Sequence, residues 1–175
     1  MSSVLRVFPL VCVLVLAGCG SPSEIMTPVP VAGGHHIGIR VGPNGPLPGK
    51  GDGFTVLHAA TAPGAEKHIV YQFALSAPPG AALQRIQVDD ISDEQSGPLV
   101  DDQHPWVTEN VWHIETSPIA ADDPRLAWIY TVTPSLRVYR FTITDQAGHQ
   151  TIIHHVTAYA NYIKGIIRSQ WGEKY

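Results

Sequence analysis

The chain has 175 residues with 15 acidic and 11 basic side chains, and its formal net charge is −4 at pH 7 with the histidines neutral. A nucleic-acid partner would need a clustered basic face, and the sequence has no basic run that would form one. We therefore expect no nucleic-acid partner. The two cysteines, Cys12 and Cys19, both lie close to the start, so no internal disulfide is expected in the rest of the chain.

The start of the chain has the pattern of a secretory signal peptide. Met1 to Arg6 is short and polar with one positive charge, and the eleven residues from Val7 to Ala17 are almost wholly apolar. A helix of that length would be about 16 Å long, too short for a hydrocarbon core of about 30 Å. A charged start, a short apolar segment and small residues at its end are typical of a signal peptide. An uncleaved anchor is the alternative.

The apolar segment ends in Leu16-Ala17-Gly18-Cys19, which resembles the lipobox of bacterial lipoproteins at every position. The resemblance implies cleavage between Gly18 and Cys19, a diacylglyceryl group on the Cys19 sulfur and an acyl chain such as palmitate on its amine. One chain binds a membrane only marginally, whereas two or three hold stably. The alternative is an ordinary secretory signal in which the cysteine is incidental.

The residue after the cysteine bears on localisation. Many lipoproteins retained in the inner membrane of Gram-negative bacteria have Asp there, whereas this chain has Gly20. The resemblance therefore implies a lipid-anchored envelope protein, in the outer membrane facing the periplasm if the host is Gram-negative. Removing residues 1–18 leaves ten basic and 15 acidic residues, a formal charge of −5.

Composition divides the mature chain into three parts. Residues 19–34 are the lipidated cysteine and a Pro/Gly/Ser-rich tether, predicted to be extended, with fifteen residues after the cysteine that could reach about 50 Å. Residues 35–160 have period-two patterns and turn signals, and we expect one β-sandwich domain there. Residues 161–175 are a C-terminal extension, either a short helix or a continued strand.

Alternation of apolar and polar residues predicts about seven short strands. The clearest places Ile69, Tyr71, Phe73 and Leu75 on one face, and turn signals recur every 8–15 residues. The fold class is therefore all-β, an antiparallel sandwich. The expected strands are His35 to Val41, Phe54 to Ala59, Lys67 to Leu75, Leu83 to Ile91, Trp106 to Ile114, Leu126 to Val132, Tyr139 to Ile143 and Thr151 to Tyr159.

The segment from Val138 to Thr151 resembles the last hairpin of bacterial immunoglobulin-like domains. Asp145, Gly148 and Thr151 match the pattern of those domains, whereas His149 replaces the usual Asn. We expect Asp145 to cap the turn through backbone amides and Gly148 to take a positive φ. The resemblance implies an immunoglobulin-like sandwich and no particular activity. The tail after Tyr159 has helical spacing, with its apolar residues opposite Lys164 and Arg168.

The sequence predicts no catalytic, cofactor-binding or metal-binding residue. The pairs His35-His36 and His154-His155 cannot chelate alone if extended, and a zinc site would need His154 to meet, for example, His68 and a carboxylate. The acidic stretch from Asp89 to Asp102 is predicted to be a solvated loop, with calcium binding as the alternative. No nucleophile, metalloprotease or phosphate-loop motif is present. The tryptophans Trp106, Trp112, Trp128 and Trp171 are expected to be mostly buried, with a saccharide or peptide groove as the alternative.

The predicted function is therefore non-enzymatic: a membrane-anchored binding, scaffold or accessory module with a protein partner in the envelope. The strands His35 to Val41 and Thr151 to Tyr159 are the predicted partner edges. The alternative is an inhibitor or immunity lipoprotein that plugs a toxin or hydrolase with a protruding loop, for which Asp89 to Asp102 is the candidate. A divergent hydrolase of cell-wall glycan is a further alternative.

Overall fold

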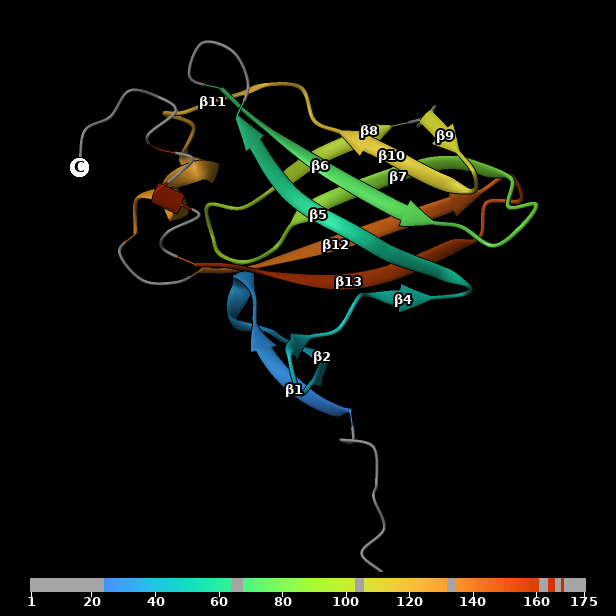
Figure 1. Cartoon of the computed structure of the whole chain (residues 1–175), viewed down its shortest axis with the longest axis horizontal. Helices are drawn as coiled ribbons and strands as arrows, with labels where there is room; N and C mark the ends of the chain where they lie inside the picture. Colours follow the sequence, from blue (N-terminus) through green and yellow to red (C-terminus); the bar gives the residue numbers. More distant parts are fainter. Residues whose placement is uncertain are drawn as a thin grey trace, which may run out of the picture.

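The computed structural model describes residues 24–63, 68–102, 106–131, 135–160, 164, 165 and 168. The signal segment, Gly18 and Cys19 lie outside the described residues. The described chain forms two large antiparallel sheets packed face to face, with a small N-terminal sheet against one of them (Figure 1). The expectation of an antiparallel β-sandwich is confirmed.

The first large sheet, which we call the β5 sheet, has the strand order β4-β5-β6-β10-β9, with β11 beside β6. The second, the β12 sheet, has the order β13-β12-β7-β8. The strands of the β5 sheet are β4 (Lys50–Gly51), β5 (Phe54–Pro63), β6 (His68–Ser76), β9 (Trp106–Thr108), β10 (Val111–Glu115) and β11 (Ile119–Ala120). Those of the β12 sheet are β7 (Leu83–Asp90), β8 (Pro98–Asp102), β12 (Ser135–Asp145) and β13 (Gln150–Tyr159).

This strand order is the one found in immunoglobulin-type sandwiches, where strands A, B, E and D form one sheet and G, F and C the other. Strands β5, β6, β10 and β9 occupy the places of A, B, E and D. Strands β13, β12 and β7 occupy those of G, F and C, and β8 lies beside β7 as an additional strand does in the variable type. The loops β6–β7 and β12–β13 are thus the equivalents of B–C and F–G.

The core lies between the two sheets and follows the predicted alternation. Phe73 of β6 packs edge-on against Tyr139 and Phe141 of β12, with ring centroids 5.3 and 5.5 Å apart. Every second residue of these strands is almost fully buried, because successive side chains point to opposite faces of a sheet. The buried residues of the two strands that share this face are Ile69, Tyr71, Phe73, Leu75, Tyr139, Phe141 and Ile143.

The predicted tether is wrong for residues 25–34. β1 (Ile25–Pro30) pairs antiparallel with β2 (His36–Gly42) around the short turn η1 (Ala32–Gly34), and β3 (Gly45–Pro46) completes this sheet. The prolines of β1 fit because β1 is an edge strand, where a missing N–H breaks no ladder. Val29 and Ile39 of this hairpin are buried with Val138 and Val156 on the outer face of the β12 sheet.

The segment predicted as a strand from Leu126 to Val132 is instead a 3₁₀ helix, η2 (Pro124–Tyr130). Asp123 caps its start by accepting from the Arg125 amide at 2.9 Å, and Pro124 occupies a first-turn position that needs no N–H donor. Leu126 and Ile129 are both fully buried, as a spacing of three residues on one face of a 3₁₀ helix requires. Val132 lies outside the described residues.

In the C-terminal extension, Lys164, Gly165 and Arg168 are helical, and the remaining residues of the predicted helix lie outside the described residues. Lys164 was expected on the polar face, but it is fully buried. Its Nζ donates to the Trp128 carbonyl at 3.3 Å, to Thr131 Oγ1 at 2.8 Å and to Ser135 Oγ at 3.1 Å. No helix within the described part of the chain is long and apolar enough to cross a membrane.

Candidate functional site

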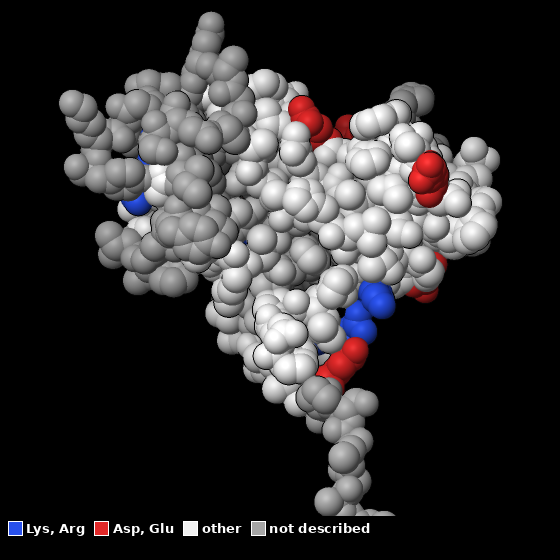
Figure 2. All heavy atoms as spheres, in the orientation of Figure 1, with Lys and Arg blue, Asp and Glu red and all other residues white. Residues whose placement is uncertain are grey.

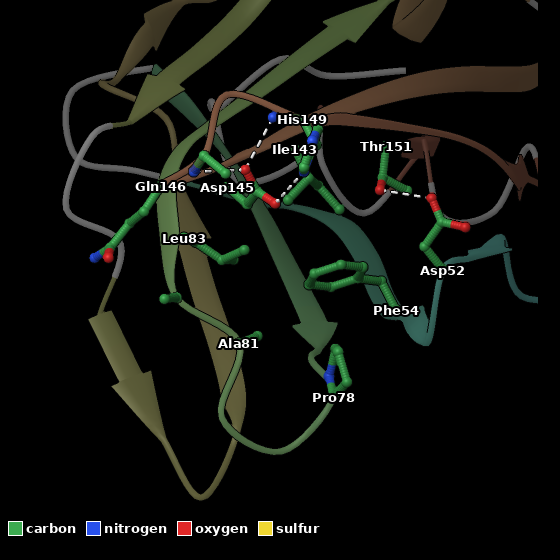
Figure 3. Close-up of a pocket in the computed structure, with 12 residues that line it drawn as sticks. Asp52, Phe54, Pro78, Ala81, Leu83, Ile143, Asp145, Gln146, His149 and Thr151 are labelled. Carbon is green, nitrogen blue, oxygen red and sulfur yellow. Dashed lines mark hydrogen bonds and ion pairs between the residues drawn. The ribbon is translucent and has the colours of Figure 1, made fainter.

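A pocket of about 510 Å³ opens at the end of the sandwich where β6 connects to β7 and β12 connects to β13 (Figure 3). We call it the end pocket. Three segments that are far apart in the sequence meet there: the β4–β5 hairpin, the β6–β7 loop and the β12–β13 loop. Pockets of about 300–1,000 Å³ are the usual size for small ligands and for anchoring side chains.

The floor of the end pocket is apolar. Phe54, Leu83 and Ile143 come from the ends of three strands, and Pro78 and Ala81 of the β6–β7 loop extend this apolar surface. Phe54 and Ile143 are buried members of the main core. The pocket therefore uncovers one end of the core, which makes it a place where a further apolar group would lose contact with water.

The rim of the end pocket is polar, and its groups are already held by local hydrogen bonds. Thr151 Oγ1 donates to Asp52 Oδ2 at 2.7 Å. Asp145 Oδ1 accepts from the amides of Ala147 at 2.8 Å and His149 at 2.9 Å, as the sequence predicts. These amide hydrogen bonds, above all that from His149, hold the pKa of Asp145 below its usual value, so this carboxylate stays charged.

Two tight turns set the rim in place. Asp52-Gly53 forms the two-residue turn of the β4–β5 hairpin, with φ of 46° and 83°. Both values lie in the left-handed region that this dipeptide tolerates. Gly148, at φ 86°, closes the β12–β13 turn, which confirms the expectation for that glycine.

Carboxyl groups with shifted pKa values in the described residues favour the charged form. A hydrolase using general acid catalysis needs a carboxyl group whose pKa is raised. Within the described residues, each carboxyl group whose pKa departs clearly from normal is shifted downward: Asp93, Asp101, Asp123 and Asp145. The rim thus offers charged and neutral acceptors around an apolar floor.

The opposite end of the sandwich is closed by a buried polar cluster. Arg137 of β12 donates to Asp90 Oδ2 at 2.9 and 2.6 Å, and to Asp93 Oδ2 at 2.7 Å. Its guanidinium also lies over the Trp128 ring, 5.3 Å from the centroid. Burial alone would lower the pKa of Arg137, but Asp90 outweighs it and the pKa is raised. The charged groups of this cluster bond to one another, which indicates a structural role.

The prediction that the acidic stretch from Asp89 to Asp102 is one solvated loop is wrong. Asp89 and Asp90 end β7, and Asp101 and Asp102 end β8, so only residues 91–97 connect the strands. Asp89 pairs with Arg140 at 2.8 Å, and Asp101 pairs with Arg85. Within the described residues, no three His, Cys, Asp or Glu side chains lie together in a way that could hold a metal ion.

A second hollow, of about 500 Å³, lies on the outer face of the β5 sheet. We call it the β9 groove. Trp106 of β9 stacks on His113 of β10, with ring centroids 4.7 Å apart, and Gln72 donates to Glu115 at 3.0 Å in the same hollow. Trp106 is 68% exposed, so the expectation of burial is wrong for this tryptophan. Trp112 is half-buried and Trp128 is buried.

His35 and His36 are both exposed, and β2 begins at His36. His154 and His155 both lie in β13, so their side chains point to opposite faces. His154 lines a hollow on the outer face of the β12 sheet, whereas His155 accepts a hydrogen bond from the Gly49 amide at 3.2 Å. Burial lowers the pKa of His155 to about 4, with His58 adding to the effect. Gly49 is so close to β13 that a Cβ there would lie 2.4 Å from the His154 carbonyl oxygen.

The two predicted partner edges are only partly open. Residues 49–51 cover the middle of the β13 edge, against Ile153 and His154. β2 pairs with β1 from His36 to Val41 and with β3 at Val41 and Gly42. The predicted availability of β13 as an edge is therefore wrong for its middle residues.

Sequence reasoning missed the end pocket, although one signal pointed to it. The Asp52-Gly53 dipeptide is a strong hairpin signal, but it stood in a stretch rich in Gly and Pro. No protein-family model matches the chain, and comparisons with curated proteins and with solved structures also gave no match. The assignment of a function therefore rests on the geometry of the described residues and on the sequence.

Proposed function

We propose that this chain is a lipid-anchored envelope protein, attached through Cys19 and placed in the outer membrane, facing the periplasm, if the host is Gram-negative. Its domain is related to bacterial immunoglobulin-like domains. It acts as a non-enzymatic binding module that receives an apolar group of a protein partner in the end pocket. The lipobox supports the anchor, and the pocket supports the binding role.

One observation supports the binding role: the core is uncovered at this end, and the acceptors around the opening already have hydrogen-bond donors. Phe54 and Ile143 lie at the base of a pocket that is open to solvent (Figure 3). In variable immunoglobulin domains, the B–C and F–G loops at this end form the recognition surface. A partner side chain that enters would bury apolar area without breaking the hydrogen bonds of Asp52 or Asp145.

A pocket-filling substitution tests the role of the end pocket. Ala82 is exposed and lines the pocket, so Ala82→Trp should fill it while leaving the sandwich intact. The full-length protein would be used to capture partners from an envelope extract. We expect one stoichiometric partner that Ala82→Trp loses.

Ala120→Trp is the matched control, because Ala120 is also exposed but lies on β11, outside the residues that line the end pocket. This variant should retain the partner. Capture that is the same for both variants and the parent chain would contradict the end pocket as the binding site.

A specific observation also favours the inhibitor alternative. Trp106 and Val107 are exposed, by 68% and 44%, on β9, the edge strand of the β5 sheet. Exposed aromatic side chains of this kind are common anchors of protein interfaces. The β9–β10 hairpin thus replaces residues 89–102 as the candidate inhibitory element.

The two candidate functions are separable by one substitution. Trp106→Ser should abolish inhibition of a target enzyme and its capture if the hairpin is the inhibitory element. The same variant should leave end-pocket binding unchanged. Loss of capture with Ala82→Trp and not with Trp106→Ser would reject the inhibitor function.

The anchor has its own test. Cys19→Ala should prevent labelling with radioactive fatty acid and leave the leader uncleaved by the lipoprotein peptidase. Normal lipid labelling of this variant would refute the proposal that Cys19 is the acylated residue.

A further inference from the structure

The N-terminal hairpin lies close to the proposed lipid anchor. Only five residues, 20–24, separate Cys19 from the start of β1 at Ile25. The six Cα–Cα steps from Cys19 to Ile25 span at most about 22 Å when fully extended. The expected tether of about 50 Å is lost because residues 25–34 belong to the fold.

β1 cannot serve as a spacer, because it is fixed to the rest of the domain. It pairs with β2 over all six of its residues, and Val29 is buried against the outer face of the β12 sheet. The Ala32 amide donates to the Ile91 carbonyl at 2.9 Å, which fixes the following turn. The headgroup layer is about 5–8 Å thick on each side of a bilayer, so the start of β1 stays within about 17 Å of the outer surface of this layer.

The part of the surface beside the anchor is suited to a bilayer. Ile25 and Met26 of β1 are 57% and 66% exposed, and Ile152 of β13 is 56% exposed. Met26 and Ile152 line one hollow of about 250 Å³ together with Arg40 and Lys50. Ile25 points to the opposite face of β1 from Met26, so we define the basal surface as Met26, Arg40, Lys50 and Ile152.

The charges of the basal surface differ from those of the whole protein. Arg40 and Lys50 line the hollow as two cations. Glu24 pairs with Arg40 at 3.2 Å, and Asp52 lies in the turn that follows Lys50. The mature chain as a whole has an excess of acidic residues. Figure 2 shows basic side chains on this lower part of the molecule, with acidic groups below them and above them to the right. Exposed apolar side chains flanked by cations are the chemistry of membrane-surface binding.

We propose that the basal surface rests on the bilayer that carries the protein's own lipid anchor, so that the sandwich is held in one orientation. The occupant is a phospholipid surface with anionic headgroups, and the proposal rests on lipidation of Cys19. β9 and β4 lie at opposite ends of the β5 sheet, and β4 lies beside β13. This orientation therefore turns the β9 groove away from the bilayer and leaves it available to partners.

Site-specific quenching tests this orientation on the full-length lipidated protein. The mature chain has no thiol other than the acylated Cys19, so Met26→Cys introduces a single reactive site. A fluorophore would be attached there, and the protein reconstituted in vesicles of phosphatidylethanolamine with a minority of phosphatidylglycerol. A fraction of the lipid would carry bromine at the headgroup end of the acyl chains. We expect loss of most of the fluorescence.

Val107→Cys is the matched control, because Val107 is also exposed on an edge strand but lies on β9. Its label should lose little fluorescence. Equal quenching at the two positions, or none at position 26, would overturn the orientation. Should Met26→Cys fail to fold, Ile152→Cys provides the same reading from β13.

The outcomes separate the orientation from the anchor on which it rests. Protein that does not float with vesicles in a density gradient refutes the proposed anchor. Protein that floats but shows no quenching at positions 26 and 152 refutes only the orientation. Lys50→Glu should reduce quenching at position 26 without changing flotation, because it reverses a charge of the basal surface and leaves the lipid in place.

Discussion

The two ends of the sandwich differ in how polar side chains cover the core. At the closed end, Arg137 and Asp90 have side chains only 3% and 2% exposed, and their ion pair is buried beneath η2. At the open end, the Asp145 side chain is 40% exposed and satisfies only its own turn. Polar groups thus complete the core at one end and leave it uncovered at the other. Stability should therefore depend on the closed end, and binding on the open end.

Breaking the buried ion pair should have the largest effect. Arg137→Met leaves Asp90 buried without its partner, and removal of one member of such a pair costs about 3–5 kcal/mol. Chemical denaturation measures this loss in the free energy of unfolding. The double variant Asp90→Leu/Arg137→Met should recover much of it, because neither charge remains buried. A loss below about 1 kcal/mol for Arg137→Met would contradict a structural role at the closed end.

The pH dependence of stability gives a second test, which depends on the buried side chain of His155. His155 lies between the two ends, and burial lowers its pKa to about 4. Its pKa in the unfolded chain is about 6.5, so the unfolded state takes up the proton first as pH falls. The free energy of unfolding should therefore fall by about 2–3 kcal/mol between pH 7 and pH 4. His154, whose pKa is also lowered by burial, adds to this fall.

His155→Asn isolates this contribution. The asparagine side-chain oxygen can accept the hydrogen bond from the Gly49 amide in place of the ring nitrogen. Thermal denaturation at several pH values should show a weaker pH dependence between pH 7 and pH 4 for the variant. An unchanged pH dependence would assign the effect to other groups.

The buried Lys164 provides a third test at the closed end. Lys164→Met removes the donor to the Trp128 carbonyl, Thr131 and Ser135. The Trp128 carbonyl keeps the Thr131 amide and hydroxyl as donors, so the cost is that of the lost hydrogen bonds from the ammonium, about 1–3 kcal/mol. Denaturation would measure the loss, and Lys164→Arg should restore part of it by keeping a cationic donor. A neutral effect of Lys164→Met would show that the C-terminal segment does not stabilise the domain.

The sandwich itself could be predicted from the sequence because its central strands are locally determined. Alternation from Ile69 to Leu75 and from Tyr139 to Ile143 fixes which face is buried, whatever the rest of the chain does. The Asp145 turn was predictable for the same reason, since its hydrogen bonds close within four residues. The alternation at Leu126 and Trp128 misled because a short 3₁₀ helix can also bury these positions.

The two ends of the sandwich could not be predicted, because each is formed by residues that are distant in the sequence. Asp90 and Arg137 are 47 residues apart, and nothing near either residue indicates that they meet. The end pocket combines Asp52, Pro78 and Ile143, which only the strand order brings together. The sequence of β1 predicts a tether because the burial of Val29 depends on Val138 and Val156, more than a hundred residues away.

The smallest expected effect on stability is at the open end. Asp145→Ala removes the acceptor for the Ala147 and His149 amides, but the turn is exposed and water can replace the carboxylate. We expect the melting temperature to fall by only a few degrees. Asp145→Asn keeps an acceptor oxygen, so it should lower the melting temperature less. Partner capture should weaken with Asp145→Ala because the rim of the end pocket loses its shape. A loss of stability as large as that of Arg137→Met, with capture intact, would reverse the assignment of the two ends.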